Sequence, residues 1–215
     1  MKNKARLNIR RDSKMGKNSI NNPTSNNSFS SLSVGLYTYF FRYPTPTNLS
    51  TFWNFGFLSF CFLLIQIISG FFLSMHYVPD VNEASNSVTQ IMRSVEYGWL
   101  YRYIHMNGAS FFFFLVYCHM GRSLYNNSFI LNKANVWLIG IVIYLLMILT
   151  AFTGYVLPWG QMSFWAATVI TNLTTSIPFI GFGVAEWIWG DFVVGNALLN
   201  RFYSFHYILP FIIFI

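Results

Sequence analysis

The chain has 215 residues, of which 54% are hydrophobic, 20% are aromatic and only 9% are charged. So apolar a composition excludes an ordinary soluble domain and indicates a polytopic membrane protein. The net charge of +7 does not indicate a nucleic-acid-binding surface, because seven of the thirteen Lys and Arg residues lie within the first 17 positions, in a basic tail.

The N-terminal part of the chain is polar. Residues 1–31 are rich in Asn, Ser, Lys and Arg and contain one acidic residue, Asp12. This composition predicts a polar, basic N-terminal extension that is disordered or wrapped on a partner, with a transit peptide as the alternative. The aromatic stretch LSVGLYTYFFRY that follows predicts an interfacial segment over 32–52.

The first predicted membrane span covers residues 53–77. About 20 apolar residues in a helix cross the hydrocarbon core of a bilayer, and this stretch is longer than that. It contains Gly56 and Gly70, fourteen positions apart. Glycine in a membrane helix ordinarily indicates close packing of helices, and this pair alone would receive that interpretation.

The second predicted span covers residues 98–122 and contains His105 and His119, again fourteen positions apart. At about 100° and about 1.5 Å per residue, this interval returns the second imidazole to nearly the same helix face, about 21 Å along the axis. A polar group at membrane depth is costly unless it is partnered, so these histidines are functional candidates. The alternative is two structural histidines that are hydrogen-bonded to neighbouring helices.

The third predicted span covers residues 136–157, in which Gly140 and Gly154 repeat the fourteen-residue interval. A flat macrocycle bound inside a bundle needs a ligand from one helix and missing side chains on the neighbouring helices. Three helices with the same interval therefore predict two haems, stacked at two depths of the membrane.

Two short helices near the membrane surface are predicted over 157–173 and 183–190, before a fourth span that starts near 197 and contains His206. The predicted fold is thus an all-α, polytopic membrane four-helix bundle, with the chain ending within span four. We expect either a fragment or a bundle that another polypeptide continues. A fourteen-residue step from His206 would place the next ligand at position 220, beyond Ile215.

The charges predict the orientation. The basic tail and the loop with Arg122 and Lys133 should face the negative side of the membrane, which places the N-terminus there. The four spans then alternate in direction, so that His105 and His206 lie at similar depths, where they can bind one iron from opposite sides. His119 lies near the other membrane surface.

Several long stretches carry a family resemblance: RYIHMNGAS, YCHMGR, GYVLPWGQMSFW, ATVITNL and RFYSFHYILPF. On these, residues 53–215 resemble the N-terminal part of mitochondrial cytochrome b, the membrane subunit of respiratory complex III. The resemblance implies transmembrane electron transfer through two non-covalent b-type haems, from quinol oxidised on the positive side to quinone reduced on the negative side, coupled to proton translocation. It also implies the mitochondrial inner membrane, a homodimeric complex, and iron–sulfur (Rieske-type) and cytochrome c1-type partner subunits.

The resemblance assigns roles to individual residues. It implies that His105 and His206 bind the lower-potential haem iron and that His119 binds the higher-potential one, whose second ligand lies beyond Ile215. Arg102 and Arg122 correspond to arginines that meet haem propionates, although interfacial anchoring is an alternative. Four glycines correspond to the positions that give the haems clearance: Gly56, Gly70, Gly140 and Gly154.

The quinol-oxidising pocket of the family corresponds to six residues here: Ile148, Phe152, Tyr155, Ala166, Val169 and Ile170. Ala166 departs from the glycine of the family's W-G-A-T pattern. Asn54 corresponds to a position on the quinone-reducing side. The resemblance further implies a catalytic subunit of quinol–cytochrome c reductase, of which residues 1–215 hold only part of both quinone sites.

Two alternatives remain at this point. One is a chloroplast-type cytochrome b that is naturally split after its fourth helix, against which GYVLPWGQMSFW and the missing histidine argue. The other is a membrane scaffold or transporter without haem. Reduced-minus-oxidised absorption spectra would distinguish these two alternatives from a mitochondrial-type cytochrome b.

Overall fold

The computed structural model describes residues 35–38, 47, 49–130 and 134–214. The chain divides into two compact units, Met1–Asn48 and Leu49–Ile215. Residues 35–38 are helical, while the predicted extension over 1–31 and most of the interfacial segment that precedes 49 lie outside the described residues. The fold below is that of the second unit.

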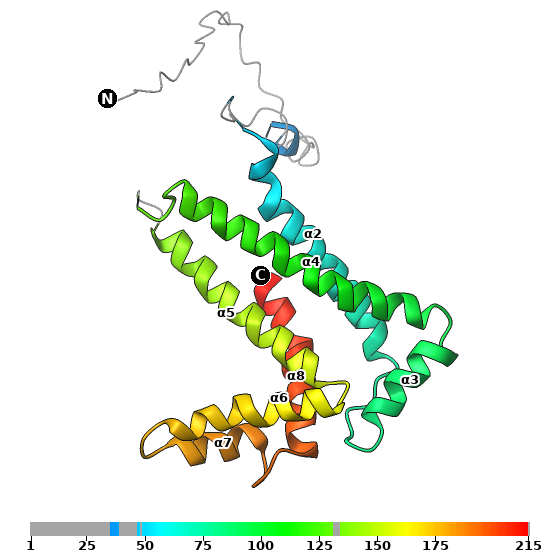
Figure 1. The fold of residues 1–215 in the computed structure, drawn as a ribbon. Coiled ribbons are helices and arrows are strands. Elements are labelled where there is room, and N and C mark those ends of the chain that lie inside the picture. Colours follow the sequence, from blue (N-terminus) through cyan, green and yellow to red (C-terminus); the bar gives the residue numbers. More distant parts are fainter. Residues whose placement is uncertain (1–34, 39–46, 48, 131–133, 215) are drawn as a thin grey trace, which may run out of the picture. The chain divides into compact units, whose positions relative to one another are not determined.

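The described part of this unit is all-helical, as predicted, and contains no strand (Figure 1). In chain order its elements are η1 (Thr51–Asn54), α2 (Phe55–Ser74), α3 (Ala84–Ser94), α4 (Gly98–Tyr125), α5 (Ala134–Val156), α6 (Gln161–Asn172), η2 (Leu173–Ser176), α7 (Gly181–Trp189) and α8 (Asn196–Phe214).

Four long helices form the bundle as two antiparallel pairs (Figure 1). Helix α2 packs along α4, α5 packs along α8, and α2 also contacts α8. Buried Phe112 and Val116 of α4 meet Met147 of α5 and join the two pairs. The predicted four-helix bundle is confirmed.

Composition alone selects three of the four predicted spans. Thr51–Ser74, Ala134–Val156 and Asn196–Phe214 are long and apolar enough to cross a membrane, and at most 22% of each most apolar window is buried. Their apolar side chains therefore face outward, where lipid suits them better than water. Helix α4 is about 42 Å long by its 28 residues but is more polar, because it carries Asn107 and two histidines.

Helices α6 and α7 lie across the ends of α5 and α8 (Figure 1). They pack on those helices through one cluster of buried side chains: Val156, Ala167, Ala185, Trp189, Leu198 and Phe202. The indole Nε1–H of Trp189 donates a 2.7 Å hydrogen bond to Thr171 Oγ1 and ties α7 to α6. The two short helices predicted over 157–173 and 183–190 are thus present, beginning at Gln161 and Gly181.

Helix α3 was not predicted from the sequence. Its only buried side chains are Ala84, Ser87 and Ile91, spaced by three and four residues, so one narrow face contacts the protein. The sequence around them is polar, and this hides the helical period from a search for apolar runs. Helix α3 packs on the start of α4, where Gly98 lies against the carbonyl of Ile91 too closely for any side chain.

Candidate haem site

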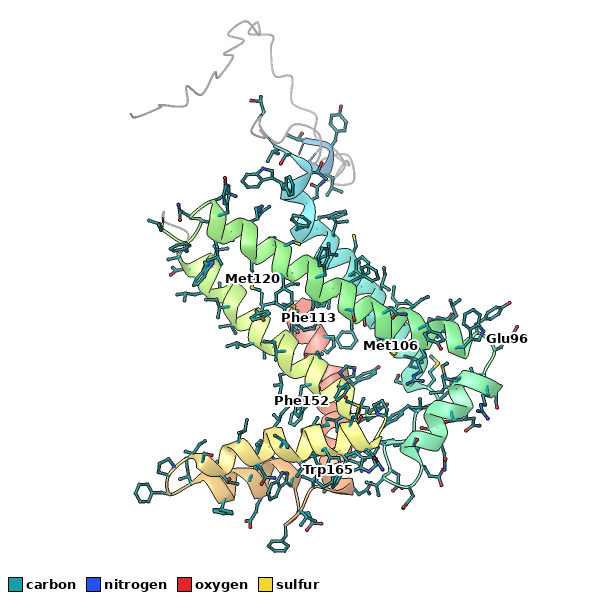
Figure 2. The ribbon with its side chains drawn as sticks, viewed as in Figure 1. Glu96, Met106, Phe113, Met120, Phe152 and Trp165 are labelled. Atoms are coloured by element: carbon teal, nitrogen blue, oxygen red, sulfur yellow. The ribbon has the colours of Figure 1, made fainter. Side chains whose placement is uncertain are left out.

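A cavity of about 610 Å³ lies inside the bundle between the two helix pairs. Its walls are mostly apolar, and include Met106 and Phe113 of α4, which are labelled in Figure 2. Its volume is in the range of cofactor sites, which are largely apolar with a few placed polar groups. Six of the residues predicted to form a site line this cavity: Gly70, Arg102, His105, Gly154, Tyr155 and His206.

His105 of α4 and His206 of α8 face each other across the cavity. Their ring centroids are 6.1 Å apart and the ring planes are inclined by 82°. A metal bound at about 2 Å by one nitrogen of each ring, with each ring centre about 1 Å further out, requires about 6 Å. Among the described residues, no group of three or more His, Cys, Asp or Glu side chains is placed to hold a metal ion. Two imidazoles without a third protein ligand suit an iron porphyrin, whose macrocycle supplies the remaining nitrogens.

The ring of His105 packs on Gly70 of α2. A Cβ atom on Gly70 would lie 3.0 Å from Cε1 and 3.5 Å from Nδ1 of that ring. The hydroxyl of buried Ser69 donates to the carbonyl of Ile65 at 2.7 Å, so we assign its oxygen, 3.0 Å from His105 Nδ1, as an acceptor of the Nδ1–H, beside the backbone carbonyl of Gln66. This bond leaves Nε2 of His105 as the nitrogen that can bind a metal.

The ring of His206 packs on Gly154 of α5 in the same manner. A Cβ atom on Gly154 would lie 2.7 Å from Nδ1 and 3.0 Å from Nε2 of the ring. Here Nδ1–H donates to a backbone group, the carbonyl of Thr150, at 2.8 Å. Both histidines therefore present Nε2 as the free nitrogen, with the other nitrogen held by the neighbouring helix.

His119 repeats this arrangement fourteen residues further along α4. A Cβ atom on Gly56 of α2 would lie 3.0 Å from Cε1 and 3.3 Å from Nδ1 of His119. The buried Nδ1 of His119 has no hydrogen-bond partner among the described residues. Gly140 of α5 is open, since no described atom lies within 4 Å of a Cβ built there.

The fourteen-residue interval has a structural cause. Helices α2 and α4 are antiparallel, so a step of fourteen residues down one matches a step of fourteen up the other, and each glycine again meets a histidine. Three of the four predicted clearance glycines, Gly56, Gly70 and Gly154, lie directly against imidazole rings. Their immediate effect is to admit the histidine of the adjacent helix.

The two candidate arginines differ in their surroundings. Arg102 lines the cavity together with His105. The guanidinium of Arg122 instead donates to the carbonyls of Trp53 at 3.2 Å and Phe52 at 3.4 Å, and lies 4.6 Å from the centre of the Trp53 ring. In this structure Arg122 fastens the end of α4 to η1.

Of the candidate quinol-site residues, only Tyr155 lines the cavity that holds His105 and His206. Its carbonyl accepts a 2.9 Å bond from Ser163 Oγ, which ties α5 to α6. Phe152, labelled in Figure 2, packs edge-on against Phe202 of α8 at 5.5 Å.

The other candidate quinone-site residues lie outside this cavity. Ile148, Val169 and Ile170 are 42%, 60% and 44% exposed, and Ala166 is half-buried. Asn54 is exposed at the end of η1. Among the described residues, the cavity is therefore lined by Tyr155 but by none of these five side chains.

Sequence reasoning missed the hydrogen-bond acceptors of the histidines. Ser69 stands directly before one of the spaced glycines, which was a readable signal, whereas the carbonyl of Thr150 could not be identified from a residue type. Gln66, whose buried Nε2 has no partner among the described residues, lies against Gly108 of α4 and was also overlooked.

The family model described as "Cytochrome b/b6/petB" matches residues 40–215. Cytochrome b of Chondrus crispus is 61% identical over 171 residues, which cover 80% of this chain and 45% of that protein. Cytochrome b of Oryza sativa subsp. japonica is 56% identical over 192 residues, covering 87% and 48%.

A solved structure titled "Hyperthermophilic respiratory Complex III" matches with a TM-score of 0.77 and 35% sequence identity, over 86% of this chain and 50% of that one. The chain spans about half the length of the curated relatives it matches.

Proposed function

Because this chain belongs to the cytochrome b family, we propose that it carries electrons across a membrane from quinol oxidised on the positive side to quinone reduced on the negative side. The transfer would pass through two b-type haems and be coupled to proton translocation. The observation that carries the proposal is the facing pair His105 and His206, 6.1 Å apart in an apolar cavity.

The residues around the cavity suit a haem. His105 and His206 would hold its iron through Nε2, since each Nδ1 is engaged by a neighbouring helix. Arg102 would meet a propionate, because a guanidinium forms bidentate contacts with carboxylates. A bound haem supplies one-electron chemistry by alternation of its iron between two oxidation states. The apolar walls would keep water from the iron and hold the local dielectric low.

A second haem would be held by His119, with Gly56 beside its ligand and Arg122 at its edge. We propose that Gly140, which is open among the described residues and lies fourteen positions before Gly154, gives this haem clearance. The two haems would then lie about 21 Å apart along α4, by the rise of the helix. His119 belongs to the higher-potential haem in this proposal, and His105 and His206 to the lower-potential one.

We propose that quinol oxidation takes place beside the ends of α5 and α6, where six residues would line the pocket: Ile148, Phe152, Tyr155, Ala166, Val169 and Ile170. Asn54 would lie on the quinone-reducing side, with ubiquinone as the substrate. The protein would act as a catalytic subunit of quinol–cytochrome c reductase.

The proposed location is the mitochondrial inner membrane, with the N-terminus and the basic extension 1–31 on the matrix side and residues 53–215 forming the di-haem bundle. The proposed partners are the iron–sulfur (Rieske-type) subunit, the cytochrome c1-type subunit and other complex III subunits, in a homodimeric complex. The structural match to a complex III chain supports this assembly.

Absorption spectra test the proposed function. In membranes that contain the assembled protein, reduced-minus-oxidised difference spectra should display b-type bands with two components that titrate at different potentials. A spectrum without b-type bands would contradict the haem assignment and favour a scaffold or transporter. Band positions and potentials typical of a chloroplast-type protein would contradict the respiratory assignment while leaving the haems in place.

Ala166 leads to a prediction about inhibitors. A methyl group where the family has glycine should spare quinol but crowd inhibitors that need that space, since overpacking costs about 1–3 kcal/mol. We expect quinol turnover to resist strobilurin-type inhibitors and Ala166→Gly to restore sensitivity at a dose at least about tenfold lower. Dose–response curves of quinol turnover measure this. Inhibition of the unchanged protein at ordinary doses would refute the prediction.

A further inference from the structure

A hydroxyl group stands directly before each of the two glycines at the cavity: Ser69 before Gly70, and Thr153 before Gly154. Both side chains are buried, at 3% and 1% exposure. Phe55 and Ile139 take the corresponding places before the other two spaced glycines. The hydroxyl–glycine pair is therefore particular to the site of His105 and His206.

Each hydroxyl donates to the carbonyls three and four residues earlier in its helix. Ser69 Oγ lies 2.7 Å from the carbonyl of Ile65 and 3.2 Å from that of Gln66. Thr153 Oγ1 lies 3.0 Å from the carbonyl of Leu149 and 2.9 Å from that of Thr150. The local geometry of the two hydroxyls is the same, but their relation to the histidines differs.

We assign Ser69 Oγ, 3.0 Å from His105 Nδ1, as the acceptor of the Nδ1–H, because the Ser69 hydroxyl already donates to the carbonyl of Ile65. Because its own proton is donated to a carbonyl, the oxygen is polarised and becomes a better acceptor, as in any chain of hydrogen bonds. A strong acceptor at the outer nitrogen of a metal-bound imidazole increases electron donation to the metal. The Ser69 hydroxyl should therefore favour the oxidised iron.

The Thr153 hydroxyl should have the opposite effect on the iron to that of Ser69. The carbonyl of Thr150 accepts both His206 Nδ1–H, at 2.8 Å, and the Thr153 hydroxyl, at 2.9 Å. Two donors draw on the lone pairs of one oxygen, so the hydroxyl weakens the bond that this carbonyl makes with His206. The Thr153 hydroxyl should therefore favour the reduced iron.

We propose that Ser69 and Thr153 are positioning residues that tune one haem in opposite directions: the Ser69 hydroxyl lowers its potential through His105, and the Thr153 hydroxyl raises it through His206. This inference rests on the proposed function, since it presumes an iron shared by the two histidines. It assigns a role to two hydroxyls that act through the hydrogen bonds of the histidines.

Redox titration of the b-type bands, in membranes with the assembled complex, tests this. For Ser69→Ala we expect the oxidised-to-reduced ratio of this haem to fall about threefold to tenfold at a fixed ambient potential, tenfold being about 59 mV for one electron. Thr153→Val, which keeps the shape of the side chain, should raise the ratio. The redox potential of the other haem should be unchanged in both variants.

Two further variants complete the design. Ser59→Ala is the matched control, because Ser59 Oγ donates to the carbonyl of Phe55 at 2.8 Å on the same helix as Ser69 and has no bond to a histidine. Its potentials should equal those of the unchanged protein. Ser69→Thr keeps the hydroxyl and should also keep the potential.

The inference fails if Ser69→Ala and Thr153→Val shift the potential in the same direction, or if neither shifts it. If Ser69→Ala does not assemble, the Thr153→Val titration decides, and a raised or unchanged potential overturns the inference. Absence of b-type bands in the unchanged protein would instead contradict the proposed function, so the two failures are distinguishable.

Discussion

Replacement of His206 with leucine is expected to remove one of two b-type haems and to leave the other in place. His206 supplies one of the two nitrogens that face each other at 6.1 Å between ring centroids. Leucine fills similar space but offers no ligand, and even the loss of a partner that only orients a metal ligand costs 10–100-fold in affinity. The haem content of membranes, measured from the b-type absorption per protein, should fall to about half.

His76→Leu is the matched control for this experiment. His76 is exposed, just after the end of α2, and lies outside the cavity and the fourteen-residue pattern. Its replacement should leave both haems and their potentials unchanged. Full haem content in the assembled His206→Leu protein would show that His206 is not a ligand.

Gly154→Ala is expected to have nearly as large an effect, through one methyl group. The new Cβ would lie 2.7 Å from Nδ1 and 3.0 Å from Nε2 of His206, closer than real side chains approach one another. Since α5 and α8 are packed helices, the imidazole must turn away and lose its bond to the Thr150 carbonyl. Overpacking of this kind costs about 1–3 kcal/mol, and here the cost falls on the ligand itself.

Alanine substitutions at two other glycines should have smaller effects on haem content than Gly154→Ala. A Cβ atom on Gly70 would lie 3.0 Å from Cε1 and 3.5 Å from Nδ1 of His105, a contact that a shift of a few tenths of an ångström relieves, so Gly70→Ala should reduce haem content less. No atom of the described residues lies within 4 Å of a Cβ built on Gly121 of α4, so Gly121→Ala should leave both haems bound. Haem content and redox titration of the three variants measure the order. A milder effect at Gly154 than at Gly70 would contradict it.

The sequence by itself determined the class of protein, most of the helices and the candidate ligands. Apolar length is a local property, and it predicted the long helices α2, α4, α5 and α8. The crowding of Trp and Tyr is local too, and it predicted the short helices α6 and α7. The common interval of His105, His119, Gly56 and Gly70 is also local, because the rise and rotation of a helix are the same in every helix. Helix α3 was not predicted, because only one narrow face of it is buried and the rest of its sequence is polar.

Only the tertiary structure decided which groups meet. The packing of α4 beside α2 and of α8 beside α5 brings His105 onto Gly70 and His206 onto Gly154, and it leaves Gly140 open. It also gives one histidine a hydroxyl acceptor and the other a backbone carbonyl, and it separates Arg102 at the cavity from Arg122 at η1. These relations depend on the register between helices far apart in the chain, and the register is set by side chains from both partners at once.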